Sequence, residues 1–443
     1  MADKPTPGKQ EKQPWLRAIS VAGYKSLSAK QRLEIRPLTI LAGANSSGKS
    51  SVMQPVLLIK QTLEAPYDPG SLLLNGANVQ LTSADQLLSK QSESECAQEF
   101  SIEFDMEGQK VEVAFSQVPR KGLTVSRTTI SGGETELVIS EDEDIDFEKA
   151  KVPLKKITGI IFPKELSDIG MLKVVRDRSF LTLGFSFEEE GNTFRFFHPG
   201  ERLTGRIASL IHVPGLRGNP ERNYKTTAVG DAFPGTFENY VASVINHWQL
   251  NSDERLTQLG VDLERLGLTW KIEAYPRDET QVELKVGRLP HGSQGDTHDL
   301  VSIADVGFGV SQTLPVLVAL LAAKAGQIVY IEQPEIHLPP RAQRALATSF
   351  ADAAKRGVIV ILETHSALLI KGIQTLVAKD ELPQELVKLH WFQRDVSGMT
   401  RISSANLDET GAFGDWPEDF DDVELASESE YLCAAEAKLF KQS

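Results

Sequence analysis

Residues 43–51 read GANSSGKSS, and this short stretch decides the fold. It matches the pattern G-x-x-x-x-G-K-[ST] and lies between a strand-like run at 32–42 and a helical pattern from about Lys49 to Leu63. In such a loop the backbone N–H groups and the positive end of the helix surround phosphate groups. Glycine lets the backbone approach the anion closely. The stretch therefore predicts a phosphate-binding loop of the strand–loop–helix type.

The residues of this loop have distinct expected roles. Lys49 would reach the β- and γ-phosphates of a nucleotide, and Ser50 would hold Mg²⁺. The remaining residues expected to contact the phosphates are Gly43, Asn45, Ser46, Ser47, Gly48 and Ser51. The alternative is a Gly-rich surface turn without a ligand, which the strand before the loop and the helix after it disfavour.

A second motif, VYIEQPEIHL at 329–338, is an apolar strand that ends in Glu332. A nucleotide-hydrolysing protein with a phosphate-binding loop places its Mg²⁺-orienting acid at the end of such a strand, beside the loop in the central sheet. Glu332 fits this role. The alternative is a strand-end glutamate that caps the next helix.

Two further motifs follow the same logic. In ADVGFGVSQTLPVLVALL (304–321), Ser311 and the start of an apolar helix can present donors to a phosphate, although a GxG before a helix is also a common turn. VIVILETHSALL (358–369) is a strand that ends in Glu363, Thr364 and His365. A histidine at a strand end is often structural, but this one falls one strand and one helix after Glu332.

Composition and charge limit the class of protein. The chain has 443 residues, of which 41% are hydrophobic and 24% charged, enough for one large or two medium domains. Its net charge of −14 argues against a wholly basic nucleic-acid binder. A basic patch remains an option in the segment 202–225, which holds Arg206, Arg217 and Arg222; the alternative is a solvated rim.

The termini and cysteines indicate a cytoplasmic protein without a membrane segment. Residues 1–14 are polar and Pro-rich, which predicts a disordered tail. The apolar run at 316–323 is far shorter than the about 20 residues of a membrane span. Cys96 and Cys433 are far apart and outside any ligand spacing, so neither a disulfide framework nor a zinc site is implied.

The rest of the chain predicts an α/β fold with a β-rich addition. Residues 99–139 alternate in four short runs, typical of an antiparallel meander, and residues 236–266 look helical. In the last third, strands at 328–331 and 358–363 alternate with helices, the first of which covers 340–355. Such alternation implies a parallel sheet covered on both faces.

The four motifs, in this order, resemble those of the ATP-binding-cassette (ABC) ATPases of the RecF/SMC/OLD group. The wording NSSGKSS, GFGVSQTLP, IEQPEIHL and ETHS is similar to that of OLD-like "AAA family" ATPases of prokaryotic anti-phage defence systems. The resemblance covers residues 16–90 and 205–425, and only 91–204 is poorly matched.

The resemblance implies a mechanism. The signature segment, Gly309 to Gln312 with Ser311 at its centre, would contact the γ-phosphate bound to a partner subunit, so that two ATP molecules are sandwiched in a homodimer. His365 corresponds to the switch histidine near the γ-phosphate. A glutamine that senses Mg²⁺ and the attacking water is expected as well, and Gln80 and Gln86 are both candidates.

One departure from the family pattern concerns the chemistry. ABC ATPases follow the strand-end acid with a glutamate that polarises water, and here Gln333 stands at that place. An amide cannot accept a proton, so general-base assistance, typically about 10²–10⁴-fold, is lost there unless another group supplies it. Glu335 and His365 are the candidate substitutes. We therefore expect slow, Mg²⁺-dependent ATP hydrolysis.

The resulting prediction is a P-loop ABC-type head, formed by residues 15–90 and 205–425, with an inserted antiparallel β or mixed lobe at 91–204 and a C-terminal helix or tail at 426–443. No nuclease domain is recognisable after His365. The first functional hypothesis is an ATP-dependent sensor or scaffold in anti-phage defence that acts with a separately encoded effector, such as a nuclease or toxin. The alternative is a RecF-like DNA-repair or recombination ATPase that binds DNA directly.

Overall fold

The computed structural model describes residues 14–90, 96–118, 122–141, 147–158, 171–186, 193–288 and 299–414. The expected tail at 1–14, apart from its last residue, and the expected C-terminal segment at 426–443 lie outside these ranges. The phosphate-binding loop and the three other motifs all lie within them.

The centre of the molecule is a six-stranded sheet in the order β11-β16-β17-β3-β18-β19. All neighbouring strands in it are parallel except β19, which runs antiparallel to β18. Its strands are β3 (Leu38–Gly43), β11 (Ile211–Val213), β16 (Ile328–Glu332), β17 (Ile359–Thr364), β18 (Val387–Arg394) and β19 (Thr400–Ala405). The predicted parallel sheet is confirmed. The expected position of the Glu332 strand is wrong, because β17 lies between it and the loop strand β3.

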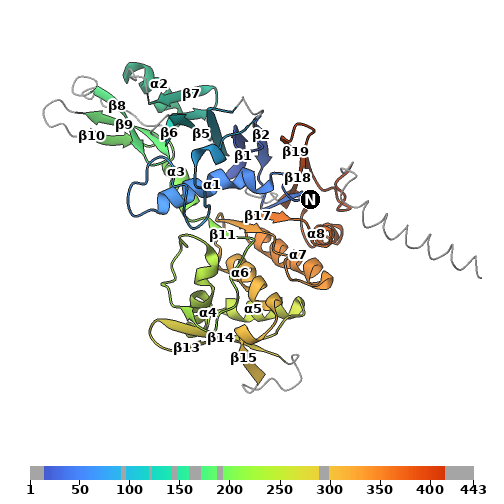
Figure 1. The fold of residues 1–443 in the computed structure, drawn as a ribbon. Coiled ribbons are helices and arrows are strands. Elements are labelled where there is room, and N and C mark those ends of the chain that lie inside the picture. The colour runs from blue at the N-terminus through green and yellow to red at the C-terminus, as the bar shows by residue number, and fades with distance from the viewer. Residues whose placement is uncertain are drawn as a thin grey trace, which may run out of the picture.

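Helices cover both faces of this sheet, as predicted (Figure 1). α1 (Lys49–Glu64) packs on one face, and α6 (Phe308–Ala322) and α7 (Pro340–Lys355) pack on the other. The other described helices are α2 (Phe147–Thr158), which packs on the strands at 122–132 and 135–140 instead, α3 (Glu201–Ala208), which packs on α1, α4 (Val241–Leu250), α5 (Glu254–Arg265) and α8 (Ala367–Ala378). The helical pattern at 236–266 is broken after α4, because Ser252 has a left-handed φ of 52° and Asp253 caps the start of α5.

Side chains of the central strands alternate between two cores. In β17, Val360 and Leu362 pack into the core with α4 to α8, whereas Ile359 and Ile361 pack into the core with α1. This alternation is what a strand buried on both faces requires. It has a direct consequence for the site, because Glu363 continues the row of Ile359 and Ile361 and therefore faces α1.

The second core lies under an antiparallel sheet of six strands in the order β2-β1-β4-β5-β6-β7. Its strands are β1 (Leu16–Ala22), β2 (Gln31–Glu34), β4 (Glu99–Met106), β5 (Gln109–Val118), β6 (Gly122–Gly132) and β7 (Thr135–Ser140). The predicted meander is present. It pairs directly with β1, so this sheet crosses the boundary that we expected at residue 90.

Two small sheets complete the described part of the fold. One has the order β10-β9-β8, and in the other β12, β13 and β15 all pair with β14. Their strands are β8 (Met171–Asp177), β9 (Phe180–Ser186), β10 (Thr193–Phe197), β12 (Tyr224–Lys225), β13 (Ile272–Pro276), β14 (Gln281–Gly287) and β15 (Leu300–Ser302).

Candidate functional site

The loop between β3 and α1 needs its glycines. Gly43 has a φ of 144°, and a Cβ there would lie 2.3 Å from the carbonyl oxygen of Phe392. Gly48 has a φ of 100°, and a Cβ there would lie 2.3 Å from Oγ1 of Thr400. Side chains are strained at such φ values and would also clash. The loop is therefore shaped by its glycines and supported from behind by β18 and β19.

Lys49 is 3% exposed and lies over the start of the loop, where its Nζ donates to the carbonyl oxygens of Gly43 (3.0 Å) and Ala44 (2.7 Å). Burial lowers the pKa of Lys49, and the nearby carboxylates of Glu363 and Glu335 oppose this shift. The Oγ of Ser47 is buried and has no hydrogen-bond partner among the described residues. The loop thus offers phosphate groups a buried cation, Lys49, an unpaired hydroxyl, Ser47, and backbone at the glycines that no side chain covers. These groups fit the phosphates of a nucleotide.

Two carboxylates meet at the ends of neighbouring strands. Glu332 of β16 and Glu363 of β17 are partners in the parallel register. Glu332 accepts from the backbone N–H of Gly215 (3.1 Å), and its other oxygen lies 3.3 Å from Nε2 of His212. Burial alone would raise the pKa of Glu332, but the hydrogen bonds from His212 and Gly215 outweigh it and the pKa is lowered.

Glu363, which has no assigned role in the four-motif prediction, lies beside the loop, where the strand-end acid Glu332 was expected. Its Oε1 accepts from the Oγ of Ser50 at 2.9 Å, and its Oε2 accepts from the hydroxyl of Tyr330 at 2.9 Å. Glu363 is 5% exposed, and burial followed by repulsion from Glu332 raises its pKa. The sequence alone could not reveal this pairing, because it depends on the strand order.

The donor set fits Mg²⁺ held together with nucleotide phosphates. Mg²⁺ is usually bound through one or two carboxylates plus substrate phosphates rather than by an all-protein cage. The described residues contain no cluster of three or more His, Cys, Asp or Glu side chains arranged for a metal ion. Ser50, Glu332 and Glu363 would therefore hold or orient the ion next to the loop, with the nucleotide supplying the remaining ligands.

The residues after Glu332 form a tight turn against the end of β17. Gln333 has a left-handed φ of 45°, and its N–H donates to the carbonyl oxygen of Glu363 (2.8 Å). Glu335 accepts from the backbone N–H of His365 at 2.7 Å, while its Oε2 is buried and unpaired among the described residues. Burial and the charge of Lys49 lower the pKa of His365. The structure thus brings Gln333, Glu335 and His365 together beside the loop.

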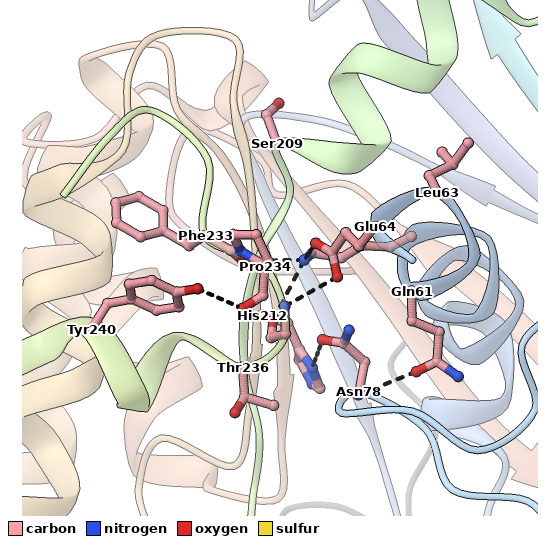
Figure 2. A network of polar contacts seen from close by, with 12 residues as sticks. Gln61, Leu63, Glu64, Asn78, Ser209, His212, Phe233, Pro234, Thr236 and Tyr240 are labelled. Carbon is pink, nitrogen blue, oxygen red and sulfur yellow. Dashed lines mark hydrogen bonds and ion pairs between the residues drawn. The ribbon is translucent and has the colours of Figure 1, made fainter. Parts of the chain in front are cut away.

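A chain of hydrogen bonds behind Glu332 was not predicted. His212 of β11 stacks on Tyr330, with ring centroids 5.4 Å apart, and its Nδ1 lies 3.0 Å from Oδ1 of Asn78. The N–H of Asn78 in turn donates to Oε1 of Gln61 in α1 (3.2 Å). Figure 2 shows His212, Asn78 and Gln61 in this sequence. A lone histidine in a short strand gives no signal that it supports a carboxylate.

The structure favours neither candidate for the sensing glutamine. Gln80 is exposed, and Gln86 bonds to Thr82 of its own turn, through its Oε1 and the Thr82 N–H at 3.0 Å. Asn78 makes the contact that connects this loop, through His212, to Glu332. The assignment of either glutamine to Mg²⁺ stays a prediction.

The signature segment lies at the start of α6. The Oγ of Ser311 donates to the carbonyl oxygen of Phe308 at 3.1 Å, and a Cβ on Gly309 would lie 3.2 Å from Leu268. Phe308 is 48% exposed, and Leu216 in the neighbouring loop is 92% exposed. The start of the signature helix is therefore accessible at Phe308.

Arg217 joins the signature helix to the Glu332 strand. Its guanidinium donates to the carbonyl oxygens of Gln312 (3.1 Å), Glu332 (2.9 Å) and Gln333 (3.0 Å). Burial lowers the pKa of Arg217 to about 10, opposed by nearby carboxylates, of which Glu335 is the strongest. Arg217 is therefore used inside the site.

Arg206 and Arg222 of the basic segment also have partners. Arg222 forms a bidentate ion pair with Asp305, at 2.6 and 3.0 Å. The guanidinium carbon of Arg206 lies 4.6 Å from the ring centroid of Trp15. The open basic patch that the segment 202–225 suggested is not formed by these three side chains.

A comparison with protein families finds a match. Residues 173–371 match the family described as "AAA domain, putative AbiEii toxin, Type IV TA system". This range contains the motifs around Ser311, Glu332 and His365 but not the phosphate-binding loop. No curated protein matches the sequence. None of the helices in the described part of the chain is long and apolar enough to span a membrane.

Among solved structures, the chain is similar to three SMC heads. The first is "the SmcHead bound to the C-winged helix domain of ScpA" (10% identity, TM-score 0.47, covering 89% of this chain and 99% of that one). The second is the Smc head with an extended coiled coil bound to the C-terminal domain of ScpA, from Pyrococcus furiosus (11%, 0.44, 89% and 96%). The third is the SMC head domain from Thermotoga maritima (10%, 0.37, 88% and 98%).

The chain thus combines an α/β fold, a phosphate-binding loop between a central strand and a helix, and a match to an AAA domain. These features are those of a P-loop ATPase.

Proposed function

We propose that the protein binds ATP with Mg²⁺ and hydrolyses it slowly, using Glu335 in place of the usual base. The observation that carries this proposal is the pair formed by Gln333 and Glu335. Gln333 has no basic oxygen to offer, whereas Glu335 has one oxygen fixed by the N–H of His365 and the other buried and unpaired among the described residues. A held carboxylate with a free oxygen beside Lys49 is suited to take the proton of an attacking water.

The other residues have supporting roles in this proposal. Lys49 and the loop N–H groups bind the phosphates, and Ser50 holds the metal ion. When bound, Mg²⁺ would neutralise charge on the phosphate oxygens. Because phosphoryl transfer depends mostly on positioning and charge stabilisation, turnover persists at a low rate even where base assistance is weak.

Single-turnover and steady-state ATP hydrolysis test the assignment of the base. We expect Glu335→Gln to lower kcat by about 10²-fold or more with little change in ATP affinity. Gln333→Glu should leave turnover unchanged or raise it, and Lys49→Ala should abolish nucleotide binding. Loss of activity in Gln333→Glu together with normal activity in Glu335→Gln would place the base elsewhere.

We also propose an ATP-dependent homodimer in which Ser311 meets the nucleotide of the partner subunit. The support is the exposure of Phe308 at the start of the signature helix, next to Ser311. Mass in solution, measured with and without ATP in Glu335→Gln, should double with nucleotide.

A matched pair of variants separates the dimer from folding. Ser311→Arg should abolish the mass change. Ser209→Arg should leave the mass change intact. It is a matched control because the Oγ of Ser209, like that of Ser311, donates to the carbonyl oxygen three residues earlier, here that of Arg206 (3.0 Å). A mass that stays monomeric in ATP for the parent variant argues against the dimer.

For the biological role, we propose an ATP-dependent sensor or scaffold in prokaryotic anti-phage defence, acting with a separately encoded effector. The support is the order and wording of the motifs. Residues 173–371 also match a family described as a putative toxin of a type IV TA system. The buried or paired state of Arg206, Arg217 and Arg222 gives no support to the alternative of direct DNA binding.

This role is tested in cells that carry the gene with its genomic neighbours. Phage plating should drop in the presence of the wild-type locus and be restored in Lys49→Ala. A tagged protein should co-purify the product of an adjacent gene. Equal plating in wild type and Lys49→Ala, with no partner recovered, contradicts the defence role but leaves the ATPase proposal standing.

A further inference from the structure

We infer that Glu363 is the positioning carboxylate of the magnesium site, because it holds the hydroxyl of Ser50 in the orientation that a metal ligand needs. This inference rests on the proposed binding of ATP with Mg²⁺ and deepens it. The motif pattern assigns the task to Glu332, whereas the contacts at Ser50 assign it to Glu363.

The first step of the argument is the hydrogen bond itself. A serine hydroxyl has one proton and two acceptor lone pairs, and its rotation is free unless a partner fixes it. The Oγ of Ser50 donates its proton to Oε1 of Glu363 at 2.9 Å. Both lone pairs of Oγ then stay available, so the hydroxyl is already in the state in which it binds a cation.

The second step is the rigidity of Glu363. The carboxylate ends the row of Ile359 and Ile361 in β17, which lies between β3 and β16, and it is 5% exposed. Its second oxygen accepts from the hydroxyl of Tyr330 at 2.9 Å, and Tyr330 is fully buried. With one oxygen on Tyr330 and one on Ser50, the carboxylate has a single orientation.

The third step concerns the competing acid. Glu332 lies one strand further from the loop, since β17 separates β16 from β3. Its two oxygens are engaged by Gly215 and His212. The two carboxylates at the strand ends therefore have different tasks: Glu363 orients Ser50, and Glu332 is fixed on the side of β11.

Residues that orient a metal ligand through a hydrogen bond typically change metal affinity by about 10–100-fold when they are replaced. The assay follows the binding of a fluorescent ATP analogue as Mg²⁺ is added. In Glu363→Gln, we expect the Mg²⁺ concentration at half-saturation to be at least about tenfold higher than in the wild type. Binding of the same analogue in EDTA should not weaken, because the loop keeps its backbone donors and the phosphates lose the repulsion of a nearby carboxylate.

Binding of Mn²⁺ to the nucleotide complex, followed by electron paramagnetic resonance, gives a second reading that does not depend on hydrolysis. Here too Glu363→Gln should weaken the metal, and Glu332→Gln should weaken it less. In Ser50→Ala, the further change Glu363→Gln should have little additional effect, because Glu363 acts through Ser50.

Tyr330→Phe covers the case in which Glu363→Gln does not fold, because it keeps the buried ring and removes the hydroxyl that donates to Glu363. The same hydroxyl also interacts with Glu332, so this variant is compared with Glu332→Gln. Tyr330→Phe should weaken Mg²⁺ in the same direction and by a smaller factor. The inference is overturned if Glu363→Gln and Tyr330→Phe bind Mg²⁺ like the wild type, or if Glu332→Gln has the larger effect. A wild-type protein that binds no ATP analogue, with or without Mg²⁺, instead overturns the proposed function.

Discussion

Replacing Arg217 by Met should destabilise the protein and disconnect the signature helix from the Glu332 strand. The guanidinium donates to three backbone carbonyls, those of Gln312 in α6, Glu332 in β16 and Gln333 in the following turn. Methionine has a similar apolar stem and no donor, so the substitution removes the hydrogen bonds and leaves most of the packing. Arg217→Lys is not an adequate replacement, because one ammonium lacks the planar fork that reaches several acceptors.

The size of the effect follows from the three carbonyls. Each buried acceptor left without a partner costs about 1–3 kcal/mol. Water reaches part of this region, and Met also relieves the cost of burying the guanidinium, which is visible in the pKa of Arg217 lowered to about 10. Both effects offset part of the loss. We therefore expect a decrease in the free energy of unfolding of about 2–4 kcal/mol.

Urea unfolding followed by tryptophan fluorescence measures this decrease, and Arg222→Gln is the matched control. Arg222 lies in the same segment and forms an ion pair with Asp305, but its side chain is 67% exposed. Exposed ion pairs contribute about 0–1 kcal/mol, so this control should stay close to the wild type. ATP turnover should drop in Arg217→Met and not in Arg222→Gln.

Two outcomes would refute this reasoning. Equal and small changes in unfolding free energy for Arg217→Met and Arg222→Gln would mean that the carbonyls find other partners. Salt-sensitive DNA binding that both substitutions weaken equally would mean that Arg217 is accessible, as the DNA-repair alternative requires.

Three further predictions concern the loop, a buried histidine and a helix contact. Gly48→Ala should lower ATP affinity and the melting temperature together, because the φ is 100° and the new Cβ would lie 2.3 Å from Oγ1 of Thr400. Burial lowers the pKa of His390 to about 4, so between pH 6.5 and 4 only the unfolded chain takes up a proton at this residue. The free energy of unfolding should therefore fall by up to about 3 kcal/mol as the pH drops through this range. Unfolding curves of His390→Gln should lack this pH-dependent decrease. Gly372→Ala should cost about 1–3 kcal/mol because its Cβ would lie 2.6 Å from the carbonyl oxygen of Arg344, and ATP binding should be unaffected.

The elements of the last third of the chain were predictable from periodicity alone. The helix expected at 340–355 and the strands expected at 328–331 and 358–363 are present within a residue. They follow from strong local patterns, a helical period between two apolar runs. The position of β1 was not predictable, because its pairing with β4 joins segments some eighty residues apart.

The basic segment illustrates a different limit of sequence reasoning. Four arginines against one acid in 202–225 look the same in a sequence whether they face solvent or bind carbonyls. Arg217 comes two residues after Gly215, whose N–H binds Glu332. This position places the side chain of Arg217 beside β16 and not on an open rim. A charged residue in a sequence indicates what it binds only when the position of its backbone in the fold is known.

The same limit decides between the two strand-end acids. Glu332 and Glu363 each end an apolar strand within a short motif, and nothing in either motif states which strand lies next to β3. That order comes from packing β17 between β3 and β16, and with it the alternation of side chains directs Glu363 towards α1 and Ser50. A motif specifies which chemical groups reach the carboxyl edge of the sheet. The strand order specifies which group each of them contacts, and in this protein it places Glu363, and not Glu332, on the hydroxyl of Ser50.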